Sequence, residues 1–141
     1  MNIASGGALI AMPLSTAYCT TKGAVLLLSE TLRGEAALHD IGVTVVCPGL
    51  VSTNLVRNAR VVSGTRRTAR EEFKTKAVGV WDGRKCPPSR VADAVLRGVE
   101  KNTGVVVLSP ETRIFDIVNR LSRRLYTWGL KRLMKLVDRW G

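Results

Sequence analysis

Three residues near the start of the chain have types and spacing that suit proton transfer. Tyr18 and Lys22 are four residues apart, and Ser5 lies thirteen residues before the tyrosine. Residues four apart on a helix share one face, so the lysine ammonium would lie beside the phenol and favour its phenolate form. A phenolate can act as a general base while a nearby serine hydroxyl holds the substrate oxygen. The trio therefore predicts acid/base chemistry, with an exposed helical pair as the alternative interpretation.

The segments around these residues support the chemical interpretation. Ser5 follows a short, mostly apolar run, and a helical pattern carries the tyrosine and the lysine. A β-branched strand, Val43–Cys47, follows and ends before a Pro-Gly pair. In the segments NIAS, AYCTTKGAV and GVTVVCPGLVST, the sequence resembles the short-chain dehydrogenase/reductase family. The resemblance extends from Met1 to about Pro110 and is strongest over residues 1–54.

This resemblance implies a role for each candidate residue. Tyr18 would transfer the proton, Ser5 would orient the carbonyl or alcohol oxygen, and Lys22 would also bind the nicotinamide ribose. The loop 48–53 resembles the family's loop that receives the nicotinamide end of NAD or NADP. In that loop Val51 would meet the carboxamide through its backbone, and Thr53 through its hydroxyl. The residues expected to bind the cofactor are Tyr18, Lys22, Pro48, Gly49, Val51 and Thr53.

The sequence lacks the glycine-rich turn that binds the phosphates of a dinucleotide. No G-x-x-x-G-x-G pattern occurs, and the cluster at residues 5–8 has only two glycines, which are adjacent. We therefore interpret the chain as the C-terminal half of a doubly wound, Rossmann-type α/β sheet, with about three strands and their covering helices. Its first strand would present an unpaired edge. We expect this truncated form to be inactive alone, because it should bind NAD or NADP poorly.

Composition narrows the class of protein. The chain has 141 residues, of which 45% are hydrophobic, and this is typical of a globular domain. No apolar run is long enough to span a membrane. Three scattered cysteines indicate reduced thiols in a cytoplasmic protein, and we expect Cys47 to be a packed, unreactive thiol. A single histidine, His39, excludes a histidine-rich metal cluster, and we predict no metal site.

Further elements follow from periodicity. Residues 17–39 predict a long apolar helix, and by resemblance this helix would form a homo-oligomer interface. Residues 54–86 are polar and basic, and would be either the variable substrate loop or a solvated surface loop. A helix from an N-cap at Ser89 to about Asn102 and a strand at Val105–Leu108 complete the predicted catalytic domain, residues 1–110. The apolar stripe of the second helix is predicted to be Val91, Val95, Leu96 and Val99.

The tail, residues 111–141, predicts a basic amphipathic helix. Apolar residues recur at helical spacing from Ile114, and the pattern resumes after Gly129. Two tryptophans, Trp128 and Trp140, flank the second part. Residues 113–141 would bind an anionic membrane surface, or pack on the domain or on a partner. Nucleic acid is disfavoured despite the formal net charge of +11, because aromatic content is 5% and no base-reading motif is present.

Together these features predict an NAD(P)-dependent oxidoreductase that transfers a hydride between the nicotinamide and a small alcohol or carbonyl substrate. Tyr18 would be the acid/base in that reaction. The alternative is a membrane-surface or partner-binding module that keeps half of a dehydrogenase fold. For that alternative the protein would be associated with membranes rather than free in the cytoplasm.

Overall fold

A three-stranded parallel sheet lies at the centre of the computed structural model, which describes residues 1–12, 15–54, 58 and 86–138. The strands are β1 (Asn2–Ile3), β2 (Val45–Cys47) and β3 (Val105–Val107), in the order β1-β2-β3. Ile3 pairs with Val46, which in turn pairs with Val106. β2 is central and its three residues are at most 1% exposed, as its uncharged, β-branched sequence predicts. The expected substrate loop, 54–86, lies almost entirely outside the described residues.

One face of the sheet is covered by α1 (Thr16–Ala36), which continues into the short 3-10 helix η2 (Ala37–His39). Together they match the helix predicted over 17–39. Val25 and Leu26 of α1 pack on a core that includes Val45 of β2. The helix ends where Asp40 takes a left-handed backbone conformation with φ of 56°.

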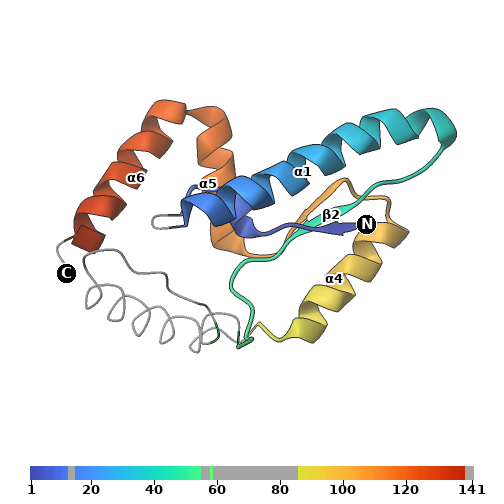
Figure 1. Cartoon of the computed structure of the whole chain (residues 1–141), viewed down its shortest axis with the longest axis horizontal. Coiled ribbons are helices and arrows are strands. Elements are labelled where there is room, and N and C mark those ends of the chain that lie inside the picture. Colours follow the sequence, from blue (N-terminus) through green and yellow to red (C-terminus); the bar gives the residue numbers. More distant parts are fainter. Residues whose placement is uncertain (13–14, 55–57, 59–85, 139–141) are drawn as a thin grey trace.

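The opposite face of the sheet is covered by α4 (Pro88–Glu100), below the sheet in Figure 1. Two predictions for this helix are wrong. Its N-cap is Pro87 rather than Ser89, because proline at position 88 fits the first turn, where no amide donor is needed. Its buried residues are Ala94 and Gly98. Of the predicted stripe, Val91 and Val95 are half-buried, whereas Leu96 and Val99 are 62% and 51% exposed.

Small residues form that buried face because the helix approaches the sheet closely. A β-carbon on Gly98 would lie 2.8 Å from Cγ2 of Val106 in β3 and 3.2 Å from Cγ2 of Thr44. Larger side chains therefore cannot occupy this face. Leu96 and Val99 were assigned to the stripe because they are hydrophobic, but hydrophobicity carries no information on how close two backbones lie.

The tail forms two helices, α5 (Pro110–Leu121) and α6 (Arg123–Asp138). The single helix predicted for the tail is divided in two at Ser122, and Gly129, after which the apolar pattern resumes, lies inside α6. Ser122 ends α5 with extended backbone, and its Oγ accepts a hydrogen bond from the Leu125 amide at 3.2 Å. It therefore caps the helix that follows. Within the described residues, no helix has the length and apolarity required to cross a membrane.

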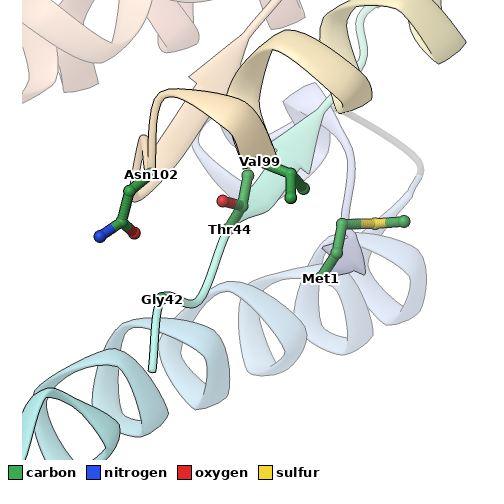
Figure 2. A pocket seen from close by; sticks show the side chains of 5 residues that line it. All are labelled: Met1, Gly42, Thr44, Val99 and Asn102. Carbon is green, nitrogen blue, oxygen red and sulfur yellow. The ribbon is translucent and has the colours of Figure 1, made fainter. Parts of the chain in front are cut away.

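A cavity of about 340 Å³ lies where the strands begin. Figure 2 shows the five residues around it, Met1, Gly42, Thr44, Val99 and Asn102. Met1 and Thr44 each immediately precede a strand, whereas Ser5 comes after β1. The cavity is thus at the opposite end of the sheet from the candidate catalytic residues. It is not the site of the predicted chemistry.

Candidate active site

The segments that follow the three strands pack against one another at the carboxyl edge of the sheet. The Gly6 amide, just after β1, donates to the Pro48 carbonyl, just after β2, at 2.6 Å. A β-carbon on Gly49 would lie 2.5 Å from both Cβ and Oγ of Ser109, which follows β3. Ligands of open α/β sheets bind at this edge. The expected chemistry is therefore in the place that the topology favours.

Ser5 occupies the turn directly beyond β1. Its backbone is extended, with φ of −170° and ψ of 162°, and it caps the 3-10 helix η1 (Gly6–Ala8). Its Oγ accepts a hydrogen bond from the Gly7 amide at 3.2 Å. The side chain is thereby oriented by the backbone, and its hydroxyl hydrogen can still be donated to another acceptor.

Tyr18 lies in the first turn of α1, beside the same glycine. A β-carbon on Gly7 would be 3.3 Å from Cε1 of the Tyr18 ring, so the ring packs directly on the η1 backbone. The Tyr18 side chain is 37% exposed. Its neighbour Cys19 accepts a hydrogen bond from the Met12 amide at 3.5 Å, which fixes the start of α1 against the preceding loop. Gly7 thus contacts both the serine hydroxyl and the tyrosine ring.

Lys22 points to the end of the same strand. Its Nζ lies 3.5 Å from the carbonyl oxygen of Ile3, two residues before Ser5, and its side chain is half-buried. One turn of α1 separates Lys22 from Tyr18, as their spacing requires. The structure therefore brings Ser5, Tyr18 and Lys22 together at the carboxyl end of β1.

The expected nicotinamide loop begins at the same edge. The Pro48 carbonyl accepts a hydrogen bond from the Gly6 amide, and Gly49 lies against Ser109. Val51 is half-buried and Thr53 is exposed. The amide of Ser52, between them, donates to the carbonyl of Cys86 at 2.8 Å. Pro48 therefore adjoins Gly6, the neighbour of Ser5, and Gly49 adjoins Ser109.

Three residues at this edge were not singled out from the sequence. Ser109 caps α5, accepting from the Thr112 amide at 3.4 Å and donating to Thr112 Oγ1 at 2.5 Å. Thr112 is 3% exposed and fills the space beside Gly6. The motif Ser109-Pro110 is itself a helix-start signal that could have revealed the first two. Tyr126 of α6, whose hydroxyl accepts the Ala11 amide at 2.6 Å, had no local signal.

Cys47 lies at the end of β2, near the site but buried. Its side chain is fully inaccessible, and this burial raises the pKa of the Cys47 thiol from 9.0 to about 11. The neutral thiol is a poor nucleophile, so its environment suits a packing role. Among the residues that the structure describes, no group of three or more His, Cys, Asp or Glu side chains could hold a metal ion.

The chain is similar in sequence to known short-chain dehydrogenases. The family model for short chain dehydrogenase matches residues 1–62, which include all of the site residues predicted from the sequence. SadH of Mycobacterium tuberculosis, named as an oxidoreductase, is 33% identical over 128 residues. The chain is a short-chain dehydrogenase-like segment. The resemblance inferred from the motifs is confirmed.

The chain spans less than half of the length of these relatives. It aligns over 89% of its own length to SadH but covers 45% of that protein. Dehydrogenase/reductase SDR family member 7B of Bos taurus is 34% identical over 100 residues, which are 71% of this chain and 28% of that protein.

Solved structures confirm the predicted α/β class. A short-chain dehydrogenase from Streptomyces avermitilis matches with a TM-score of 0.67 and 26% identity, over 95% of this chain and 50% of that one. A short chain dehydrogenase/reductase from Burkholderia phymatum, solved in complex with NAD, matches with a TM-score of 0.73 at 19% identity. That match covers 88% of this chain and 47% of the other, and it shows the fold alone.

Proposed function

We propose that this dehydrogenase segment carries the catalytic part of an NAD(P)-dependent oxidoreductase, with Tyr18 as the acid/base. The observation that carries the proposal is that Gly7 adjoins both residues: its amide donates to Ser5 Oγ at 3.2 Å, and a β-carbon on it would lie 3.3 Å from Cε1 of the Tyr18 ring. The proposal requires that one substrate oxygen reach both hydroxyl groups. The substrate class would be a small alcohol or carbonyl compound.

The residues present fit the nicotinamide end of the cofactor. Lys22 has three ammonium donors, and its 3.5 Å bond to Ile3 is long, so the same group can donate to ribose hydroxyls. Pro48 and Gly49 begin the expected nicotinamide loop at the same edge, and we propose that Val51 and Thr53, further along this loop, contact the nicotinamide. The phosphates are a different matter, since the sequence contains no glycine-rich turn. We therefore propose that another polypeptide segment binds the phosphates.

In this scheme the nicotinamide supplies or accepts the hydride when it is bound. Tyr18 gives a proton to the substrate oxygen during carbonyl reduction and takes it back during alcohol oxidation. Ser5 accepts from the Gly7 amide, so its own hydrogen is free to point at that oxygen. The Lys22 ammonium stabilises the negative charge that develops on the phenol.

Two proteins, this chain and a chimera, test the proposal. Titration of the 141-residue chain with NADH and NADPH, followed by nicotinamide fluorescence, should give weak, non-saturating binding. A chimera in which this chain replaces the matched region of SadH should bind saturably and turn over. In the chimera, Tyr18→Phe should lower kcat by about a hundredfold or more while leaving NADH affinity within about twofold. Thr20→Ala, an exposed hydroxyl in the same helix, is the matched control and should change neither.

The outcomes separate the two parts of the proposal. Full turnover by the Tyr18→Phe chimera would remove Tyr18 from the chemistry. Tight binding of NADH by the unmodified 141-residue chain would instead remove the need for a second segment, and would leave the role of Tyr18 intact.

We also propose that α1 joins two copies of the chain. Three leucines on its outer side are exposed: Leu27 by 66%, Leu28 by 55% and Leu32 by 39%. Leu28 and Leu32 are one turn apart and so form a continuous apolar strip. Sedimentation velocity should give a dimer that Leu28→Glu dissociates. A monomer at all concentrations would contradict this arrangement.

A further inference from the structure

The helix α5 turns its apolar side away from the domain. Thr112 faces inward and is 3% exposed. In contrast Ile114, Ile117 and Leu121, at positions i, i+3 and i+7 of one face, are 61%, 48% and 81% exposed. Phe115 adds a ring that is 48% exposed. A helix of a globular domain normally turns such a stripe to the core, so this exposed face of α5 is a candidate contact surface.

The helix α6 also has one side packed on the domain and one side exposed to solvent. Tyr126 faces the domain, where its hydroxyl accepts the Ala11 amide at 2.6 Å. Trp128, two residues further, is on nearly the opposite side of the helix and is 57% exposed. Leu125, which shares the Trp128 face at a spacing of three, is 55% exposed. One side of α6 is thus held to the protein while the other presents an indole and a leucine. In Figure 1, α6 extends outward from the body that α1 and the sheet form.

Cations surround this exposed face. Arg132 lies over the Trp128 ring, with its Cζ 5.0 Å from the ring centroid. Spacing by the helical turn places four exposed basic residues on the Trp128 side of α6, namely Arg124, Lys131, Arg132 and Lys135. Acidic groups are few: Asp116 in α5 already pairs with Arg120 at 3.0 Å. The exposed apolar groups are therefore set in a field of positive charge.

We propose that α5 and α6 bind the surface of an anionic lipid bilayer. The exposed side chains of Ile114, Ile117, Leu121, Leu125 and Trp128 would enter the boundary between headgroups and acyl chains. The basic side chains of α6 would stay among the lipid phosphates, with their alkyl stems along the apolar region. Tryptophan is suited to this boundary, because one edge of its ring is apolar and the other carries an N–H donor.

Charge complementarity favours the bilayer over the other occupants. A second protein surface packed on the Trp128 face would desolvate Lys131, Arg132 and Lys135, and each buried cation would need its own acidic partner. Lipid phosphates supply those partners without a fixed geometry. Nucleic acid would also neutralise the cations, but it would leave the aliphatic stripe of α5 in water. Of these three occupants, an anionic bilayer alone offers contacts to both sets of side chains.

Vesicle binding tests this proposal on the full chain. Trp81→Phe and Trp140→Phe leave Trp128 as the single tryptophan. Its emission should shift to the blue with vesicles of 70% phosphatidylcholine and 30% phosphatidylserine, and brominated acyl chains should quench it. Pure phosphatidylcholine should give neither effect. In co-sedimentation, Lys131→Glu with Arg132→Glu should weaken binding by about thirtyfold or more, because each cation near the surface contributes roughly fivefold.

A matched control has the same change in charge at another place. Arg97→Glu with Lys101→Glu, exposed residues in and after α4, should bind within about threefold of the parent. Equal weakening by both pairs would show a diffuse charge effect and overturn the assignment to α6. A blue shift that depends on protein concentration rather than on lipid would assign the face to a second copy. A shift produced by RNA and absent with vesicles would assign it to nucleic acid. Circular dichroism confirms that each variant is folded before its binding is read.

Discussion

The guanidinium group of Arg33 donates two hydrogen bonds to Asn102, which is 69 residues further along the chain. Nη1 bonds to the side-chain Oδ1 at 2.9 Å, and Nη2 bonds to the backbone oxygen at 2.7 Å. Nη1 also donates to the carbonyl of Val43 at 2.7 Å. Val43 lies just before β2 and Asn102 just before β3, so one side chain of α1 joins the connections that lead into both strands.

Arg33→Ala should lower the free energy of unfolding by about 1–3 kcal/mol, because three charge-assisted hydrogen bonds are lost from a half-buried site. Arg33→Lys should recover less than half of that loss, since an ammonium cannot form the same planar fork. Urea titrations measure both changes, with the exposed Arg97→Ala as the control. A loss no larger for Arg33→Ala than for the control would contradict the role of this side chain.

A glycine holds together the ends of β2 and β3. A β-carbon on Gly49 would lie 2.5 Å from Cβ and Oγ of Ser109, so Gly49→Ala forces the two segments apart. The expected loss in unfolding free energy is about 1–3 kcal/mol, as for other overpacked positions. The double variant with Ser109→Gly should recover most of it, less a few tenths of a kcal/mol for the lost helix cap. Additive effects in this double-mutant cycle would show that the two residues do not meet.

Stability should fall at high pH because of Cys47. Burial raises the pKa of this thiol from 9.0 to about 11, so folding favours the neutral form. The resulting stabilisation is fully present below pH 9 and is lost as the pH rises towards 11, by up to about 2.7 kcal/mol at 1.36 kcal/mol per unit. Urea midpoints at pH 8, 9, 10 and 11 should therefore fall more steeply for the parent than for Cys47→Ala. Parallel curves for the two proteins would refute this account.

The elements that local patterns define could be predicted from the sequence. The spacing of Tyr18 and Lys22 requires a helix, and α1 provides it from Thr16 to Ala36. The uncharged run ending at Cys47 forms the central strand, because only a strand covered on both faces tolerates such a sequence. The candidate site follows from these two elements. Ser5 comes directly after β1, so it lies at the carboxyl edge of the parallel sheet, where α1 also begins.

The errors concern contacts between distant segments. Leu96 and Val99 were expected to be buried, but the close approach of α4 to Val106 selects Gly98. The bond between Tyr126 and Ala11 spans 115 residues. No local pattern contains the information that sets these contacts.

That bond predicts how α6 affects the candidate site. Ala11 lies in the loop between Ser5 and Tyr18, and its amide donates to the Tyr126 hydroxyl at 2.6 Å. Tyr126→Phe removes the acceptor but keeps the ring, so the loop should open more easily by about 1 kcal/mol, the usual net value of one hydrogen bond. Amide hydrogen exchange at Ala11 should then be about fivefold faster, while exchange in β2 should be unchanged.

Thr127→Ala is the neighbouring control. Its hydroxyl donates to the carbonyl of Arg123 within α6 at 2.7 Å, so its loss affects the helix without touching the loop. Exchange at Ala11 in this variant should match that of the parent. If Tyr126→Phe also leaves Ala11 exchange unchanged, α6 does not restrain the loop, and α6 and the candidate active site are mechanically independent. Faster exchange in Tyr126→Phe alone means that a force or ligand acting on α6 reaches the loop that leads into Tyr18.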